Sequence, residues 1–195
     1  MGEKDSAEKM LENCSDVFAD IINGFLYQGK YVVSEEDLID SAGRTQYKAD
    51  SNVLHEQERD SLKYWKRDKV KFALFGIENQ TQIDRYMPMR IIGYDGAEYR
   101  NMLSKDRSKK NRAGVKPVPV ITLVLYFGKD HWDKNKSLKD LMKLPEDLES
   151  YFNDYKINVF EVAWLTDDEI SRFTSDFRII ADFFVQNRKN ERIRL

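Results

Sequence analysis

The sequence predicts an α/β fold with a central mixed β-sheet flanked by helices. Apolar runs of strand length alternate along the chain with segments of helical periodicity. No Gly-, Pro- or Ser-rich linker divides the 195 residues, and a chain of this length can bury a core without disulfides or metals. We therefore expect one domain over residues 1–195. The basic tail follows an apolar helix abruptly, so the alternative that a C-terminal extension is lacking stays open.

Composition narrows the class of protein. Charged residues make up 34% of the chain, but their signs balance to a net charge of -2, so the overall charge does not indicate a nucleic-acid partner and any such site must be local. No apolar run approaches the ~20 residues of a membrane span, and the N-terminus lacks the apolar stretch of a secretory signal. A single cysteine excludes an internal disulfide. These features predict a soluble, cytoplasmic protein with no membrane partner and no small-molecule cofactor.

The first half of the chain predicts two helices around a hairpin. Apolar residues at three- and four-residue steps indicate an amphipathic helix over 6–27. The polar segment 34–52 predicts a short helical turn at Ser34 followed by a loop. Aromatic and β-branched residues over 61–65 and 70–78 predict the two arms of a hairpin. Pro88 then begins a helix, which the glycines after it weaken.

The second half predicts two strands and two helices. Residues 118–128 are apolar with little alternation, which indicates a central strand. A short helix over 137–144 stops at Pro145, and 157–165 predicts another strand. Thr166 and Glu169 form a capping box for a last helix that contains Phe173, Phe177 and Ile180.

Two carboxylates mark the open end of the predicted hairpin. Asp60 begins one arm and Glu78 ends the other, and Gln80 shares the face of Glu78 because strand side chains alternate. Two carboxylates on adjacent strands can bind a hard divalent cation such as Mg²⁺. The alternative is that Glu78 is an ordinary solvated residue at a strand end.

The register of the hairpin decides whether this site can form. If residues 66–69 were a symmetric four-residue connection, Asp60 would oppose Phe75 and point away from Glu78. The metal site therefore requires a bulge or an odd loop. Asp68 is a rival acid, but its place between the arms is typical of a turn aspartate.

A basic segment precedes the predicted central strand. Clustered cations can contact DNA phosphates whatever the net charge of the chain, although a solvated loop would look the same. The residues are Lys105, Arg107, Lys109, Lys110, Arg112 and Lys116.

Three segments, residues 59–81, 87–99 and 117–132, together resemble the YhgA-like family of recombination-promoting nucleases and transposases, a branch of the PD-(D/E)XK nuclease superfamily. The resemblance covers roughly residues 16–164. In that family an aspartate opens one hairpin strand, a Glu-x-Gln closes the next, and a Met-Pro-x-Arg helix and an apolar strand ending in an aromatic residue and glycine follow. The matching residues are Asp60, Glu78, Gln80, Met87, Pro88, Arg90, Tyr126 and Gly128.

The resemblance implies a metal-dependent DNA endonuclease whose mixed sheet and flanking helices form a restriction-endonuclease-like core. Asp60 and Glu78 would hold Mg²⁺ or Mn²⁺ together with the backbone carbonyl of Asn79. Gln80 would stand where many superfamily members have lysine, and a neutral amide can orient the attacking water but cannot supply positive charge. Lys63 is a candidate for the missing cation, but it lies on the other face of its strand, and a solvated lysine is the better interpretation.

The same resemblance suggests further residues. Related nucleases take a ligand for a second metal from the first helix, where Asp16 and Asp20 stand, although a solvated helix face is the alternative. Gln82 and Tyr86 form a Q-x-x-x-Y pattern that would contact the DNA backbone together with Arg90.

Two functions stay open at this stage. The first is a DNA endonuclease linked to recombination or transposition. The alternative is a catalytically degenerate nuclease fold that acts as a DNA-binding or protein-interaction module, which the neutral Gln80 permits. The sequence leaves the oligomeric state open, with a homodimer as one option.

Overall fold

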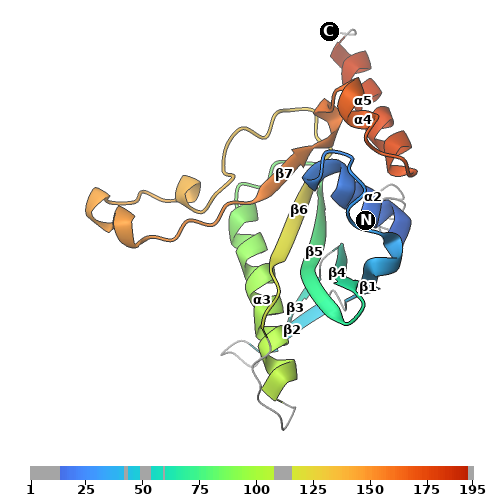
Figure 1. Cartoon of the computed structure of the whole chain (residues 1–195). Coiled ribbons are helices and arrows are strands. Elements are labelled where there is room, and N and C mark those ends of the chain that lie inside the picture. The colour runs from blue at the N-terminus through green and yellow to red at the C-terminus, as the bar shows by residue number, and fades with distance from the viewer. Residues whose placement is uncertain (1–13, 42–43, 49–53, 59, 108–115, 193–195) are drawn as a thin grey trace.

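The fold is an α/β arrangement around a mixed five-stranded sheet, as predicted (Figure 1). The computed structural model describes residues 14–41, 44–48, 54–58, 60–107 and 116–192. Of these, residues 44–48, 54–58, 105–107 and 191–192 are described by their backbone alone. The strand order is β1(Leu38–Asp40), β4(Ser61–Arg67), β5(Val70–Gln80), β6(Val120–Tyr126) and β7(Asn158–Glu161). β1, β4 and β5 pair antiparallel, whereas β5, β6 and β7 run parallel.

Helices cover both faces of this sheet because the central strands alternate between two apolar surfaces. Odd-numbered residues of β5 and β6, such as Phe75 and Leu125, pack against α2(Ser15–Leu26) and α5(Phe177–Arg192). Even-numbered residues, such as Leu74 and Val124, face α3(Met87–Arg107). In Figure 1, α3 accordingly lies on one side of the sheet and α2 and α5 lie on the other. No helix of the described residues is both long and apolar enough to cross a bilayer.

The hairpin of β4 and β5 contains the bulge that the metal-site hypothesis requires. Asp68 and Lys69 form the turn, and Asp68 adopts the left-handed φ of 55° that suits a turn aspartate. The register then shifts between Trp65 and Lys66, so that Ser61 pairs with Ile77. One more step in this register sets Asp60 opposite Glu78, on the same face.

One strand and the first arm of a hairpin lie where the sequence predicted a loop. The helical turn at Ser34 is present as η1(Glu35–Asp37), but β1 follows it directly. β2(Arg44–Lys48) and β3(Leu54–Glu58) then pair antiparallel as a separate two-stranded sheet. The loop prediction for this region was therefore wrong, because backbone pairing gives these polar residues a strand conformation without an apolar pattern.

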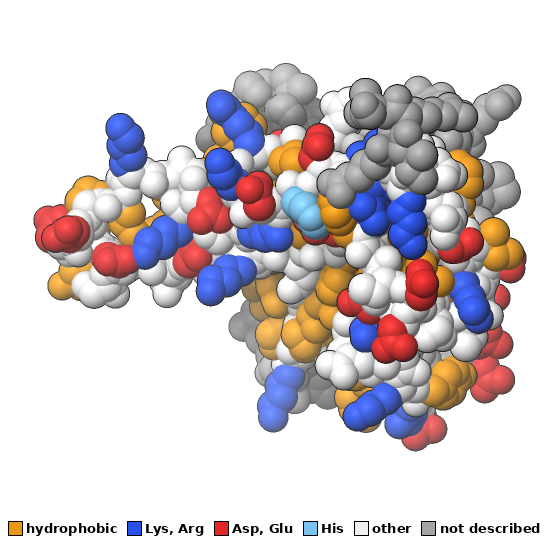
Figure 2. All heavy atoms as spheres, turned by 90° about the horizontal axis from the view of Figure 1, so that it is seen from above, with side chains coloured by type: hydrophobic (Ala, Val, Ile, Leu, Met, Phe, Trp, Pro, Cys, Tyr) orange, Lys and Arg blue, Asp and Glu red, His pale blue; other side chains and the backbone are white. Residues whose placement is uncertain are grey.

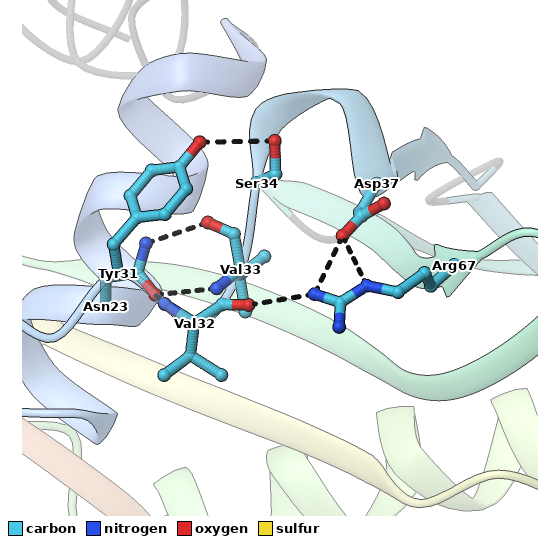
Figure 3. Close-up of polar contacts among 7 residues, drawn as sticks. All are labelled: Asn23, Tyr31, Val32, Val33, Ser34, Asp37 and Arg67. Atoms are coloured by element: carbon cyan, nitrogen blue, oxygen red, sulfur yellow. Dashed lines mark hydrogen bonds and ion pairs between the residues drawn. The ribbon is translucent and has the colours of Figure 1, made fainter.

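Polar side chains of α2 hold the chain that follows it. Asn23 Oδ1 accepts hydrogen bonds from the backbone N–H groups of Val32 (3.0 Å) and Val33 (2.9 Å), and its amide donates to the Val33 carbonyl (2.8 Å; Figure 3). Figure 3 also shows Arg67 reaching Asp37 across the start of β1. Asn23 is only 5% exposed, because these backbone groups of the following segment surround its amide.

The C-terminal region departs from its prediction in three places. Only η2(Lys139–Leu141) forms within 137–144, and β7 ends at Glu161, where η4(Val162–Trp164) begins. The capping box of Thr166 and Glu169 is confirmed, but it begins the short α4(Asp167–Ile170), and α5 is a separate helix. Between β6 and β7 an arm, residues 129–157, projects from the body and contains η3(Glu146–Tyr151) (Figures 1 and 2).

Gly24 lets α2 approach the turn before α5. A Cβ atom at this position would lie 2.1 Å from Cε1 of the buried Phe173. We expect Gly24→Ala to lower the free energy of unfolding by about 1–3 kcal/mol, despite the better helix propensity of alanine. Urea unfolding measures the change. Phe173→Leu should recover part of the loss in a double variant, whereas strictly additive effects would exclude this clash as the cause.

Candidate active site

The candidate site lies at the C-terminal end of β5. Glu78 is 4% exposed, on the face of the sheet that α3 covers, and it pairs in register with Val124 of β6. Gln80 is half-buried on the same face and pairs with Tyr126. The strand thus carries a carboxylate and an amide out of the apolar core to one edge of the sheet.

Arg90 of α3 forms an ion pair with Glu78. Its Nη2 lies 2.6 Å from Glu78 Oε1, and its Nη1 lies 3.1 Å from Asp84 Oδ2 in the turn before the helix. Burial acts to lower the pKa of the Arg90 guanidinium, but hydrogen bonds to Tyr94 and Asp84 and the charge of Glu78 outweigh it and raise the pKa. Arg90 is therefore a fixed positive charge beside Glu78.

The Met-Pro-x-Arg motif explains how this arginine reaches the site. Met87 is fully buried against Val124 and Tyr126, which fixes the first turn of α3 on β6. Pro88 suits a first turn, where backbone N–H groups need no helical partner. Asp84 Oδ1 accepts a hydrogen bond from the Tyr86 backbone (2.8 Å) and shapes the turn that precedes the helix. Arg90 then follows one turn into the helix, above the end of β5.

Asp60 caps the end of the β4–β5 ladder. Its Oδ2 accepts a hydrogen bond of 2.9 Å from the backbone N–H of Asn79. The contact ties the first residue of one arm to the residue beside Glu78 in the other arm.

The aromatic-glycine ending of β6 supports the same edge. Phe127 N–H donates to the Gln80 carbonyl at 2.8 Å, which extends the pairing past the end of β5. The buried ring of Tyr126 packs edge-on against Trp132 and also lies over Gly128, where a Cβ atom would approach the Tyr126 hydroxyl to 2.1 Å. Burial, together with the charges of Asp130 and Glu161, raises the pKa of the Tyr126 hydroxyl. Only glycine therefore fits at position 128 while this ring stays in place.

The first helix does not bring its acids to this site. Asp16 is exposed on α2, whose apolar face packs on the opposite side of the sheet. Asp20 is buried and accepts four hydrogen bonds, from the backbone N–H groups and the hydroxyls of Thr174 and Ser175. Asp20 was predicted to be a ligand of a second metal or, alternatively, a solvated residue. The structure instead shows it anchoring the segment that begins α5.

Two other predicted residues lie close to the site without joining it. Gln82 is exposed in the turn after β5, outside any helix, so the helical spacing assumed for the Q-x-x-x-Y pattern is absent. Tyr86 is exposed directly before α3 and its ring contacts the Arg85 guanidinium. Arg90, predicted to bind DNA, is instead the partner of Glu78, although it is 38% exposed.

The basic segment lies at the far end of α3 from Glu78. Lys105 and Arg107 belong to the last turn of this 21-residue helix, about 30 Å from its first turn. Lys116 is exposed just before β6. Lys109, Lys110 and Arg112 lie outside the described residues.

Lys63 is not the solvated lysine that the sequence predicted. It is 2% exposed, forms an ion pair with Asp40 of β1, and lies 5.7 Å from the ring centre of Phe18. It pairs in register with Phe75, on the face opposite to Glu78, so its predicted place on the other face holds. The positive charge of Lys63 therefore lies on the α2 side of the sheet, away from Glu78.

The oxygen atoms available at the strand end suit a hard cation. Within the described ranges, no group of three or more His, Cys, Asp or Glu side chains gathers in one place. A metal here would depend on the two carboxylates of Asp60 and Glu78 plus backbone oxygen, a sparse set of the kind that Mg²⁺ completes with water and substrate phosphate. A separate pocket of about 310 Å³ beside β7 is lined by none of the predicted site residues.

Comparison with known proteins places the chain in a family. The family model described as "Putative transposase, YhgA-like" matches residues 53–194. The chain belongs to this family. The YhgA-like match contains Asp60, Glu78, Gln80 and Arg90, whereas α2 with Asp16 and Asp20 lies before it. Searches of curated proteins and of solved structures gave no match.

Proposed function

We propose that this YhgA-like protein is a metal-dependent DNA endonuclease that hydrolyses phosphodiester bonds in a recombination or transposition reaction. Family membership suggests DNA as the partner. The single observation that carries the proposal is the bulged register of the hairpin, which sets Asp60 and Glu78 on one face at one end of the sheet. A symmetric hairpin would have separated the two carboxylates.

Asp60 and Glu78 would hold Mg²⁺ or Mn²⁺, with the backbone carbonyl of Asn79 as a third ligand. When bound, such an ion lowers the pKa of a water molecule and stabilises charge on the scissile phosphate. Gln80, half-buried on the Glu78 face, contributes one amide acceptor and two donors, which can orient the attacking water. It moves no proton itself, because an amide does not titrate in this range.

Arg90 is our candidate for the positive charge that Gln80 lacks. Its guanidinium is held by two carboxylates on separate elements, so little conformational entropy is lost when it meets substrate. Arg90 is also partly exposed. One edge of its guanidinium can therefore bind a phosphate oxygen while the other edge keeps its ion pair with Glu78. In this role Arg90 stabilises the charge that develops on the phosphate in the transition state.

The alternative function is a degenerate nuclease fold that binds DNA or protein without cleavage. The observation in its favour is the same ion pair: Arg90 already compensates the charge of Glu78. The two functions differ in their dependence on a divalent metal: the nuclease needs the ion to cleave DNA, whereas a binding module shows no cleavage with it.

Cleavage of supercoiled plasmid by the purified protein tests the proposal. The nuclease hypothesis expects nicked and linear products with Mg²⁺ or Mn²⁺ and intact plasmid with EDTA. Gel-shift binding with no turnover in either metal would instead support the degenerate module. Asp68→Asn is the matched control, because this acid lies in the turn at the other end of the hairpin.

Gln80 offers a graded test of the same chemistry. Gln80→Ala should slow cleavage by about 10- to 100-fold, less than the ~10²–10³-fold typical of a lost transition-state donor, because Arg90 remains. Gln80→Lys should keep activity near that of the wild type, since lysine stands here in related nucleases. Single-turnover rates on plasmid measure both, and an inactive Gln80→Lys variant would contradict the role given to Gln80.

A further inference from the structure

An apolar stripe runs along one exposed side of α3. Four large side chains recur there at steps of three, seven and four residues and are 38–54% exposed: Met89, Ile92, Tyr99 and Leu103. Tyr99 lies at the edge of the stripe nearest β6, where its hydroxyl accepts a hydrogen bond from the Val120 N–H at 3.1 Å. Gly96 lies in the gap between Ile92 and Tyr99. This spacing of three, four, three and four residues marks one face of a helix that packs against another helix. In Figure 1, α3 is the only labelled helix on its side of the sheet, and the sheet takes up its other face.

Nothing in the described part of the chain requires glycine at position 96. Among the described atoms, the one nearest to a Cβ atom built there is Arg100 Nη1, at 4.0 Å, so this part of the chain leaves room for a side chain. Glycine is a poor residue for a helix interior, and it is used where two backbones come close. The position of Gly96 at the centre of the stripe therefore points to close approach by a second helix.

We propose that α3 packs antiparallel against α3 of a second copy of this chain, with the two-fold axis at Gly96. In this register Met89 lies opposite Leu103 of the other copy, Ile92 lies opposite Arg100, and Tyr99 lies opposite Gly93. The apolar stem of Arg100 can cover Ile92, and Gly93 leaves room for the Tyr99 ring, so the stripe can pair with itself as an isologous interface requires. The antiparallel helix dipoles also attract each other.

The exposed side chains of the stripe supply about half of the area that a standard dimer interface buries. Large side chains present roughly 200 Å² each when fully exposed, so the four residues of the stripe, with Tyr86 at 48% exposure, offer roughly 400–500 Å² per copy. A standard interface buries ~800 Å² per partner, and the helix backbone at Gly93 and Gly96 with the stem of Arg100 adds to the total. The stripe contains no acidic residue among its described members that would oppose this contact.

Sedimentation equilibrium of the full chain tests the interface. The wild type is expected to be a dimer, and Gly96→Arg is expected to weaken association at least about 100-fold, because the monomer tolerates the side chain and the dimer does not. Ile179→Arg is the matched control, since Ile179 is 70% exposed on α5, on the other side of the sheet. Circular dichroism verifies that each variant is folded. A monomeric wild type, or a dimer that survives Gly96→Arg, would overturn the proposal.

Cross-linking tests the antiparallel register. In a Cys14→Ser background, which removes the exposed native thiol, Met89→Cys and Leu103→Cys are prepared separately and then mixed. Oxidation is expected to cross-link the mixture and to leave each variant alone uncross-linked. Self-cross-linking of Met89→Cys would show a parallel pair and refute this register.

Discussion

Glu78→Gln is expected to abolish metal-dependent DNA cleavage, with a fall of at least about 10³-fold, while the protein stays folded. The amide keeps the volume of the side chain and can still accept a hydrogen bond from Arg90, but it loses the charge that binds a hard cation. Plasmid nicking gives the rate, and the thermal midpoint reports the fold. Alanine is a worse choice here, because Glu78 is buried and its removal would leave Arg90 beside a cavity.

Asp60→Asn should reproduce this loss, and the double variant should be little worse than either one, as expected for residues that act as a unit. Asp68→Asn serves again as the matched control and should cut at the wild-type rate. If the wild type cuts DNA and Glu78→Gln cuts equally well, Glu78 is not a metal ligand in this protein.

Asp20→Ala is expected to lower the free energy of unfolding by about 3–4 kcal/mol. The substitution removes a buried carboxylate that accepts hydrogen bonds from Thr174 and Ser175, two of them from backbone N–H groups, at 2.8 and 2.9 Å. These donors would then be left in a partly buried environment without their acceptor, which costs more than the bonds themselves. Urea unfolding measures the difference.

Asp16→Ala is the matched control, because Asp16 is an exposed acid on the same helix. Its effect should stay within about 0.5 kcal/mol. Equal stability of the two variants would contradict the anchoring role of Asp20. The pair also bears on the second-metal prediction, since Asp16→Ala tests activity without disturbing α5.

The β4–β5 hairpin, α3 and β6 follow closely from the sequence. Their apolar patterns are strong because each element is buried on at least one face, and the residues that match the family all fall within this unit. The bulge itself had no local signal. It was a condition set by the need to bring Asp60 and Glu78 together, and the pairing of Ser61 with Ile77 confirms it.

The failures of prediction have a common physical cause. Asn23 and Asp20 look like solvated residues, yet both are buried, because backbone donors from other segments satisfy them. Lys63 is buried with an acid of β1, a strand that the sequence did not indicate. In each case the decisive partner is remote in the chain or belongs to an element without an apolar pattern. Polarity alone does not show where such a residue lies.

The ion pair of Arg90 and Glu78 was missed for a related reason. The sequence predicted that Arg90 contacts the DNA backbone and that Glu78 holds a metal ion, with no contact between the two. A strand end followed within ten residues by the first turn of a returning helix was the available signal, because a parallel crossover brings that turn back over the strand. The site thus remains a prediction from the sequence, and the fold adds the ion pair between Arg90 and Glu78.

In the proposed nuclease, the length of α3 sets a scale for the DNA substrate. Its first turn stands over Glu78 and its last turn carries Lys105 and Arg107, with 21 residues between the two ends. At ~1.5 Å per residue the helix measures roughly 30 Å, which equals about nine base pairs of B-DNA at ~3.4 Å each. A duplex that touches both ends of the helix in one chain must therefore extend nearly a full helical turn from the scissile bond. In an antiparallel pair, the same two ends belong to different copies and come together, so a much shorter duplex meets both.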